Sequence, residues 1–548
     1  MNFAHQDPAL GPLLDRLLDP DDRARAEPLL ARLGALAADE IDRLAAQADA
    51  HPPRLRPYTP DGERIDAIDY HPAHDRLAKI AYEDFGLAAM SHRPGVHGWA
   101  TPVPHVVKYA LSYLFVQAEF GLACPLSMTD SAARILRLFD PERHAAALAA
   151  LTSTDPRTRA TGAMFITERQ GGTDVGLTGT RATEHDTHWT LRGRKWFASN
   201  PDADVVLALA RVPGQGEGTR GLGMFLVPRL LPDGSRNALR IDRLKDKLGS
   251  RSIPSGEVTF EDAYAQPVGR LGEGFRQMAE MLNVSRLSNA MRAAALMRRA
   301  VREAVEHTRS RHVLGLPLFD QPLMRMTLLP LLLDTEAALG FVLEAASRLD
   351  AADRGDGSCR ELVRVLTPLA KFTLCKRARF ITGETMEIRG GNGYIEDWVD
   401  PRLLRDAHLG SIWEGSSNVI ALDVLRCMRR ESSHHALADA YGSRLSARWQ
   451  ALRAKGDWIL DLPEAEQQML AGGYANQLSH AVMATLLLQQ AEYEADLTGN
   501  GRKMLVAHTY RGLLEDPGTL PLPALEHLAD LADGGYIPLS VAKEAADV

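Results

Sequence analysis

The chain is poor in cysteine, and its cysteines are not paired in the sequence. The four cysteines of this 548-residue protein are scattered and form no Cys-x-x-Cys motif. Disulfide frameworks and structural zinc sites both need clustered thiols, so we expect neither. This scarcity favours a reducing compartment, and we expect a cytoplasmic protein.

Long apolar runs are also missing. Runs such as 327–333 and 483–488 are far shorter than the roughly 20 residues that a membrane-spanning helix requires. No apolar segment adjoins Arg16, the first arginine or lysine, as it would in a secretory signal. We therefore expect no membrane association.

Excess charge is confined to the end of the chain. The net charge is −8, and residues 431–548 alone contain eight Lys/Arg and sixteen Asp/Glu. Such a tail repels a phosphate backbone on average, because nucleic-acid affinity depends on basic residues that displace counterions.

The order of sequence patterns predicts a mainly α protein with a central β-domain. Short β-branched or alternating runs punctuated by Gly, Pro, Asp and Asn begin near residue 160, after a helical N-terminal part that includes a Pro-rich loop at 51–60. Helical patterns longer than 25 residues follow at 275–311, 323–350 and 359–389. We expect four domains: 1–158 (helical), 159–272 (β), 273–430 (long-helix bundle) and 431–548 (additional acidic helical domain).

Three glycine-rich or aromatic segments could bind a flat, phosphate-bearing ligand. Residues 167–174 (TERQGGTD) offer hydroxyls and backbone amides, and residues 195–200 (KWFASN) offer rings for stacking. Residues 389–394 (RGGNGY) end a long helix. Each has a plainer interpretation by itself: a Gly-Gly turn, an aromatic strand end in the core, and a C-cap.

Glu414 is the candidate catalytic base. It lies in residues 411–418 (SIWEGSSN), beside an aromatic residue and before a helix that Ser416 or Ser417 would cap. A carboxylate in an apolar setting has a raised pKa, as a general base near neutral pH requires. The alternative is an ordinary helix-start acid that the helix dipole favours.

In this order and at these separations, the four segments resemble the acyl-CoA dehydrogenase family. Residues 311–321 (RHVLGLPLFDQ) resemble a fifth motif, which reaches the FAD of a neighbouring subunit. The resemblance implies an N-terminal helical domain, a β-sandwich middle domain and a C-terminal helix bundle. Within the family, Trp413 and the long tail resemble the AidB branch, a homotetramer with a fourth helical domain.

The resemblance also implies a role for single residues. Glu414 would remove the α-proton of an acyl-CoA thioester while flavin N5 accepts the β-hydride, and Arg286 would lie at the substrate site. Ser285 stands where some members place the base, which leaves Glu414 in that role. Either Trp196 or Phe197 would stack on the flavin. The residues expected to bind FAD are Thr167, Gly172, Thr173, Phe197, Ser199, Arg311, Gln321, Gly390, Gly391, Trp413, Ser416 and Asn418.

Three functions remain open at this stage. The first is FAD-dependent α,β-dehydrogenation of an acyl-CoA. The second is a DNA-associated flavoprotein of the alkylation response with little turnover, which the acidic tail disfavours. The third is a structural assembly with a vestigial FAD. The sequence does not reveal the acyl chain or the electron acceptor.

Two further clusters have plain interpretations. The pair His434-His435 is expected to be solvated rather than to bind a metal. Arg298, Arg299 and Arg302 are expected to form an exposed or intersubunit helix face.

Overall fold

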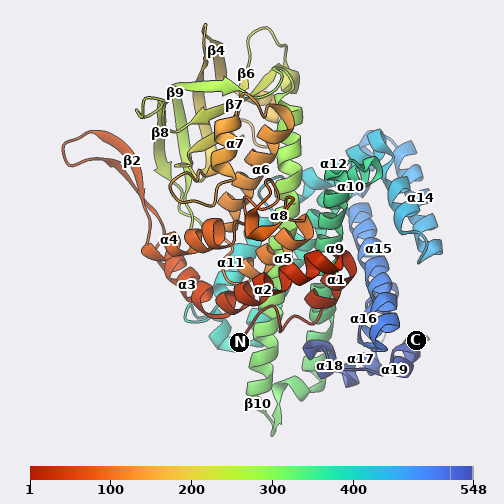
Figure 1. Ribbon diagram of the computed structural model, residues 1–548. Coiled ribbons are helices and arrows are strands. Elements are labelled where there is room, and N and C mark those ends of the chain that lie inside the picture. The colour runs from red at the N-terminus through yellow and green to blue at the C-terminus, as the bar shows by residue number, and fades with distance from the viewer. Residues whose placement is uncertain (519, 546–548) are drawn as a thin grey trace. The chain divides into compact units, whose positions relative to one another are not determined.

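The computed structural model describes residues 1–518 and 520–545 (Figure 1). Its residues form two compact units. The β-unit contains residues 40–103 and 119–285. The helical unit contains the described residues of 1–39, 104–118 and 286–548.

A seven-stranded sheet forms the centre of the β-unit (Figure 1). Its order is β3-β6-β4-β5-β9-β7, with β8 paired to β9, and a further pairing of β6 with β7 curls the sheet onto itself. The strands are β3 (Gly162–Phe165), β4 (Arg181–Glu184), β5 (Trp189–Ser199), β6 (Val205–Arg211), β7 (Leu222–Pro228), β8 (Leu239–Leu244) and β9 (Ser255–Pro267).

The sheet encloses one apolar core and rests on a second. Phe165, Phe225 and Phe260 are buried inside the curl. Alternate residues of β6, such as Leu207 and Leu209, face the other way and pack with apolar side chains of the helix α6 (Ala123–Phe139). This alternation follows from the two-residue period of a strand. The helices of the unit are α3 (Asp42–Ala50), α4 (Pro72–Ala78), α6 (Ala123–Phe139) and α7 (Ala145–Leu151).

The predicted Pro-rich loop at 51–60 is only partly a loop. Strand β1 (Arg54–Tyr58) pairs antiparallel with β2 (Arg64–Asp69). The register shifts between Arg56 and Tyr58, around Pro57. A two-stranded ribbon tolerates a proline there because one edge of each strand needs no partner.

Long helices build the helical unit, and their bounds lie close to those predicted. The helices up to residue 431 are α1 (Leu10–Leu17), α2 (Pro20–Leu36), α5 (His105–Val116), α8 (Gly274–Ser310, of which 286–310 belong to this unit), α9 (Pro322–Asp353), α10 (Gly357–Ile388), α11 (Asp400–Gly410) and α12 (Ser417–Glu431). Helix α9 is long and apolar enough to cross a membrane, but 78 % of its most apolar window is buried inside the protein, as in a core helix.

The acidic tail belongs to the same core as the bundle. Its helices are α13 (Ser433–Tyr441), α14 (Ser446–Asp461), α15 (Glu464–Thr498), α16 (Arg502–Glu515), α17 (Leu522–Glu526), α18 (Leu528–Asp533) and α19 (Leu539–Glu544). Helix α15 packs against α9, α10 and α12 (Figure 1). Glu336 of α9 forms buried ion pairs with Arg502 and Lys503 of α16.

The arginine cluster of α8 is not exposed, contrary to the prediction. Arg298, Arg299 and Arg302 are all buried within the helical unit. The Arg298 guanidinium lies 3.5 Å from the Asp7 carboxylate, and that of Arg302 stacks on the Phe3 ring at 3.3 Å from its centroid. The N-terminal segment covers this helix face, which the local pattern of α8 does not reveal.

Candidate active site

In the β-unit, the loop 167–174 is a closed turn with an exposed tip. The backbones of Glu168 and Gly171 exchange two hydrogen bonds of 3.1 Å. Gly172 and Thr173 beyond them are exposed, and Thr167 is half-buried. The turn therefore presents its hydroxyl and backbone groups outward.

A buried ion pair anchors this turn to strand β5. The Glu168 carboxylate accepts from Lys195 Nζ at 2.7 Å, and also from the Thr180 hydroxyl and the backbone N–H groups of Thr180 and Gly179. Lys195 Nζ also donates to Leu209 O at 2.9 Å. Burial by itself raises the pKa of Glu168. The Lys195 charge and the hydrogen bonds outweigh burial, so the pKa is lowered from its ordinary value. The pair keeps both charges buried and satisfied.

A β-bulge turns two aromatic side chains out of the sheet. The pairing of β5 with β9 shifts register between Lys195 and Ala198. Both of these residues point inward and are fully buried, so Trp196 and Phe197 are displaced together toward the surface. Bulges commonly re-aim side chains next to functional sites.

The two rings differ in what covers them. Lys245 Nζ lies 3.8 Å from the Trp196 ring centroid, and the guanidinium groups of Arg169 and Arg243 lie within 6 Å. The Phe197 ring is 55 % exposed. Ser199, at the end of the strand, is half-buried with its hydroxyl 3.4 Å from that of Ser255.

In the helical unit, Arg311 and Gln321 frame a small hairpin after α8. Strand β10 (His312–Val313) pairs with β11 (Leu316–Pro317), and Leu314 at the tip is 93 % exposed. The Gln321 side chain donates to Val313 O at 2.9 Å. The hairpin therefore projects an apolar tip and the exposed Arg311.

The glycine turn caps α10 as the sequence predicts. Gly390 has φ +68°, the left-handed conformation that favours glycine after a helix, and a Cβ on Gly391 would meet no atom within 4 Å. The charge of Arg389 is neutralised, because its guanidinium pairs with Asp400 at 2.6 Å and with Glu303 at 3.1 Å.

The loop that carries Glu414 is strained and clamped. Glu414 has φ +57°, a left-handed conformation that costs a non-glycine residue about 1–2 kcal/mol. Arg286 Nε donates to Glu414 O at 3.0 Å, and Lys371 Nζ donates to the next carbonyl, Gly415 O. Side chains from α8 and α10 thus fix both carbonyls of the loop.

The helix after this loop begins without the predicted side-chain cap. Ser416 occupies the N-cap position of α12, but its hydroxyl makes no capping hydrogen bond in the part of the chain that the structure describes. Both Ser416 and Asn418 are exposed, and Asn418 borders a cavity of about 700 Å³ lined by residues of α10, α12 and α15.

Residues of α8 hold the ring and the carboxylate beside the loop. Trp413 Nε1 donates to Asn289 Oδ1 at 2.9 Å. The Arg292 guanidinium lies 4.5 Å from the Trp413 ring centroid, and its Nη2 is 3.8 Å from Glu414 Oε1. Asn289 and Arg292 are one helical turn apart and so share a face of α8.

Burial dominates the electrostatics of Glu414. Desolvation raises its pKa, and the nearby cations Arg292, Lys371 and Arg286 oppose this rise without cancelling it. Glu414 Oε2 is buried and has no hydrogen-bond partner among residues 1–518 and 520–545. A carboxylate with a raised pKa and one unoccupied oxygen is suited to accept a proton.

The structure adds residues that the sequence motifs did not single out. Arg292, Lys371 and Asn289 lie far from Glu414 in the chain but surround its loop. Glu168 and Lys195 stand at or near the start of the motifs 167–174 and 195–200. Their opposite charges were the signal in the sequence that could have indicated this ion pair. Arg286, which we expected at the substrate site, lies beside Glu414, where its side chain contacts the loop backbone and forms a 2.6 Å ion pair with Asp423.

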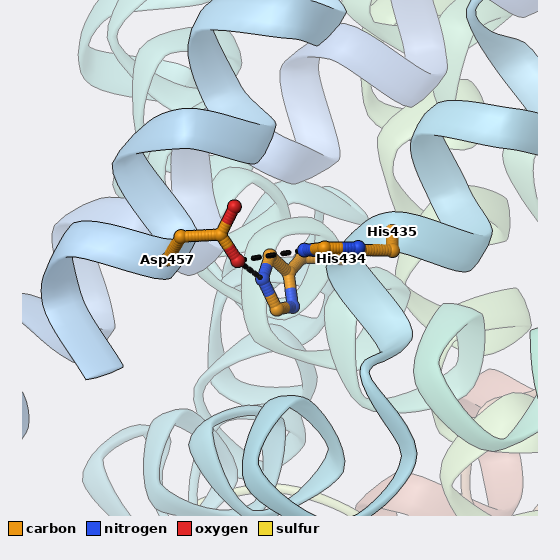
Figure 2. A group of neighbouring side chains, drawn as sticks. All are labelled: His434, His435 and Asp457. Carbon is orange, nitrogen blue, oxygen red and sulfur yellow. Dashed lines mark hydrogen bonds and ion pairs between the residues drawn. The ribbon is translucent and has the colours of Figure 1, made fainter. Parts of the chain in front are cut away.

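The histidine pair forms a small polar cluster with an aspartate (Figure 2). The Nε2 atoms of His434 and His435 lie 3.0 Å and 2.6 Å from the same oxygen of Asp457. His434 is buried, so the expected solvated pair is wrong for this ring. Its Nδ1 has no partner in the described ranges, and a metal on Nε2 would leave a buried N–H there without an acceptor. Two hydrogen bonds to Asp457 account for the cluster.

Three known domain families match successive parts of the chain. Residues 1–155 match the adaptive response protein AidB N-terminal domain. Residues 163–263 match the acyl-CoA dehydrogenase middle domain, and residues 272–428 match the acyl-CoA dehydrogenase C-terminal domain.

Two curated relatives and one solved structure match most of the chain. AidB of Escherichia coli (strain K12) is 36 % identical over 82 % of this chain and 84 % of its own length. Acyl-CoA dehydrogenase family member 11 of Caenorhabditis elegans is 32 % identical over 93 % of this chain and 82 % of its own. The structure of Caenorhabditis elegans ACDH-11 in complex with C11-CoA has a TM-score of 0.86 and 29 % identity, and covers 94 % of this chain and 92 % of that chain.

These matches span both units and confirm the resemblance, the fold class and the FAD cofactor inferred from the motifs. The chain belongs to the acyl-CoA dehydrogenase family of FAD-dependent enzymes and resembles its AidB branch.

Proposed function

We propose that the protein catalyses the α,β-dehydrogenation of an acyl-CoA thioester with Glu414 as the base. The observation that carries this proposal is the Glu414 carboxylate, which is buried, has a raised pKa and keeps one oxygen without a partner in the described chain. Arg286 and Lys371 hydrogen-bond the carbonyls of Glu414 and Gly415, and so fix the backbone from which the carboxylate projects toward a bound α-carbon.

Features within each unit, taken separately, fit a flavin. The exposed Phe197 ring offers a face for stacking, and Gly172 and Thr173 offer backbone and hydroxyl donors at an exposed turn. At Gly391 a ligand could approach the backbone, because no atom fills the space of a Cβ. FAD, when bound, supplies the acceptor for the β-hydride.

The chain's own groups perform the proton chemistry. The Glu414 carboxylate takes the α-proton, and the low exposure of Glu414 and Arg292 keeps water from competing for it. The backbone N–H of Glu414 is the proposed donor to the thioester carbonyl, which gains negative charge as the proton leaves.

A relative supports the substrate class. ACDH-11 of Caenorhabditis elegans was solved with C11-CoA, and its structure covers nearly the whole of this chain. We therefore propose an acyl-CoA as substrate.

The hairpin after α8 supports a proposed homotetramer. Leu314, Leu316 and Leu323 are more than half exposed around Arg311. An exposed apolar tip of this kind fits insertion into another subunit. The DNA-associated alternative gains no support from the tail, because its net negative charge repels a phosphate backbone.

Anaerobic titration with acyl-CoAs of different chain length tests the function. We expect at least one to bleach the flavin absorbance of the wild type, and we expect Glu414→Gln to slow this strongly. A substrate that reduces both proteins equally fast would remove Glu414 from the role of base. A holoenzyme that no acyl-CoA reduces would contradict the proposed activity.

A further inference from the structure

Arg292 is an unusual residue to find beside a catalytic carboxylate. It lies in the middle of α8, and its side chain is completely buried. A buried guanidinium is costly unless other groups compensate for the lost hydration. Two compensating contacts belong to the Glu414 loop: the Trp413 ring face at 4.5 Å and the Glu414 carboxylate at 3.8 Å.

The other charged groups near Glu414 have different primary contacts. On α8, Arg286 pairs with Asp423 of α12, which also binds Arg364 and Arg426. On α10, Lys371 donates to Gly415 O. Cys375, also on α10, is a buried thiol whose pKa is raised to about 11, so it stays neutral.

The Arg292 distance to Glu414 is itself informative. At 3.8 Å, Nη2 is too far from Oε1 for a hydrogen bond but close enough for a strong charge interaction in a buried site. A hydrogen bond would occupy the carboxylate lone pair that must accept the proton. A cation just beyond this range favours the ionised carboxylate and leaves its oxygens available.

We propose that Arg292 is a positioning residue that keeps Glu414 ionised at neutral pH while leaving its oxygens available to the substrate. This inference rests on the proposed role of Glu414 as base. In the proton-transfer step the α C–H bond breaks and an O–H bond forms on Glu414. Arg292 remains protonated throughout and neither gives nor takes a proton.

The contact with Trp413 helps to hold the Arg292 guanidinium in position. The guanidinium lies 4.5 Å from the Trp413 ring centroid, and Asn289 holds that ring by accepting a hydrogen bond from the indole N–H. A lysine at this position would keep the charge but would stack less well, since its ammonium is not planar.

Three variants of the FAD-loaded enzyme test the proposal. Arg292→Met removes the charge and keeps much of the length of the side chain, and Arg292→Lys keeps the charge. The matched control is Arg302→Met, which removes another buried arginine of α8 about 15 Å further along the helix axis. Unchanged flavin absorbance and circular dichroism confirm that each variant is folded and loaded.

The first readout is the pH profile of flavin reduction by acyl-CoA in a single turnover. Removing a neighbouring cation raises a carboxyl pKa, so we expect the acid limb of Arg292→Met to move to higher pH by about 1–3 units. Arg292→Lys should restore most of the wild-type profile, and Arg302→Met should keep it. An unshifted Arg292→Met profile, or an equal shift in Arg302→Met, would overturn the proposal.

The second readout needs no turnover. Infrared difference spectra between each protein and its Glu414→Gln form isolate the Glu414 carboxyl band, which can be titrated directly. The protonated band should persist to higher pH in Arg292→Met than in wild type, and identical titrations would refute the inference. If no acyl-CoA reduces the wild type, the dehydrogenase proposal fails, but this titration still decides the role of Arg292.

Discussion

Glu168 in the β-unit and Glu414 in the helical unit are both buried carboxylates beside a buried cation, but their surroundings differ. Glu168 receives the Lys195 ammonium at 2.7 Å together with hydroxyl and backbone donors, and its pKa is lowered. Glu414 has its cation at 3.8 Å, an oxygen without a partner in the described residues, and a raised pKa. A carboxylate whose oxygens all have hydrogen-bond partners serves as a structural anchor. A carboxylate with an oxygen that lacks a partner can still accept a proton.

The largest expected effect separates the two residues by activity. Glu414→Gln should slow flavin reduction by acyl-CoA by about 10²–10⁴-fold, because the amide cannot accept the α-proton. Rapid-mixing absorbance measures the rate. Glu361→Gln, on the exposed side of α10, is the control and should react like the wild type. If Glu414→Gln reacts as fast as the wild type, Glu414 is not the base, and the proposed difference in role between Glu414 and Glu168 is lost.

The second effect separates them by stability. Lys195→Met leaves Glu168 buried without its ammonium partner, which typically costs about 3–5 kcal/mol. Chemical unfolding of the β-unit, followed by tryptophan fluorescence, measures this loss. The control is Arg192→Gln, which removes a solvent-exposed ion pair with Asp262 and should leave the unfolding midpoint unchanged. Equal midpoints for both variants would show that the buried pair is no anchor.

The third effect concerns the pKa shifts, which are opposite in sign for the two carboxyls. The folded pKa of Glu168 lies below its ordinary value of 4.5, so its stabilisation is complete above that pH and is lost as pH falls through the lowered pKa. Glu168→Gln should therefore flatten the acid limb of the stability curve. For Glu414, the proposed base, we expect the reduction rate to increase with pH as the carboxyl ionises, and its raised pKa places this increase above the ordinary glutamate range. A rate that falls with rising pH across this limb would contradict the comparison.

The smallest expected effect concerns Phe197, the proposed FAD contact near the Glu168–Lys195 ion pair. Phe197→Ala should weaken FAD binding by about 0.5–1.5 kcal/mol, the usual contribution of aromatic stacking. Fluorescence titration of the apoprotein with FAD measures this change. Tyr58→Ala removes another exposed ring from the β-unit and serves as the control. If the two variants bind FAD equally well, the ring that stacks is not Phe197.

The sequence predicted the long helices better than the strands. Helix α10 begins and ends within two residues of its predicted bounds, because three turns or more of apolar periodicity leave few alternatives. The short runs that predicted strands, at 164–167, 189–191, 205–210, 224–227 and 257–260, do not include β4 and β8. β4 has four residues, and β8 is rich in charged residues, so each is stabilised by pairing with a neighbouring strand rather than by its own pattern.

The site was predictable where a motif is contiguous and hidden where the fold assembles it. Glu414 and Trp413 stand together in the chain, and the resemblance identified them. Arg292 meets them only because its face of α8 turns toward a loop more than a hundred residues away. Neither the charge nor the helical position of Arg292 distinguishes it from the arginines that pack on the N-terminal segment.

The left-handed turn at Glu414 has a consequence for selectivity among acyl groups. Side chains from α8 and α10 hydrogen-bond the carbonyls of Glu414 and Gly415, which fixes the backbone from which the carboxylate projects. As the proposed base, Glu414 can then move toward a substrate only through its own side-chain torsions. Under the proposed dehydrogenation, discrimination would lie in how each thioester presents its α-hydrogen to a carboxylate of such short reach, so unsuitable acyl groups would bind yet react slowly.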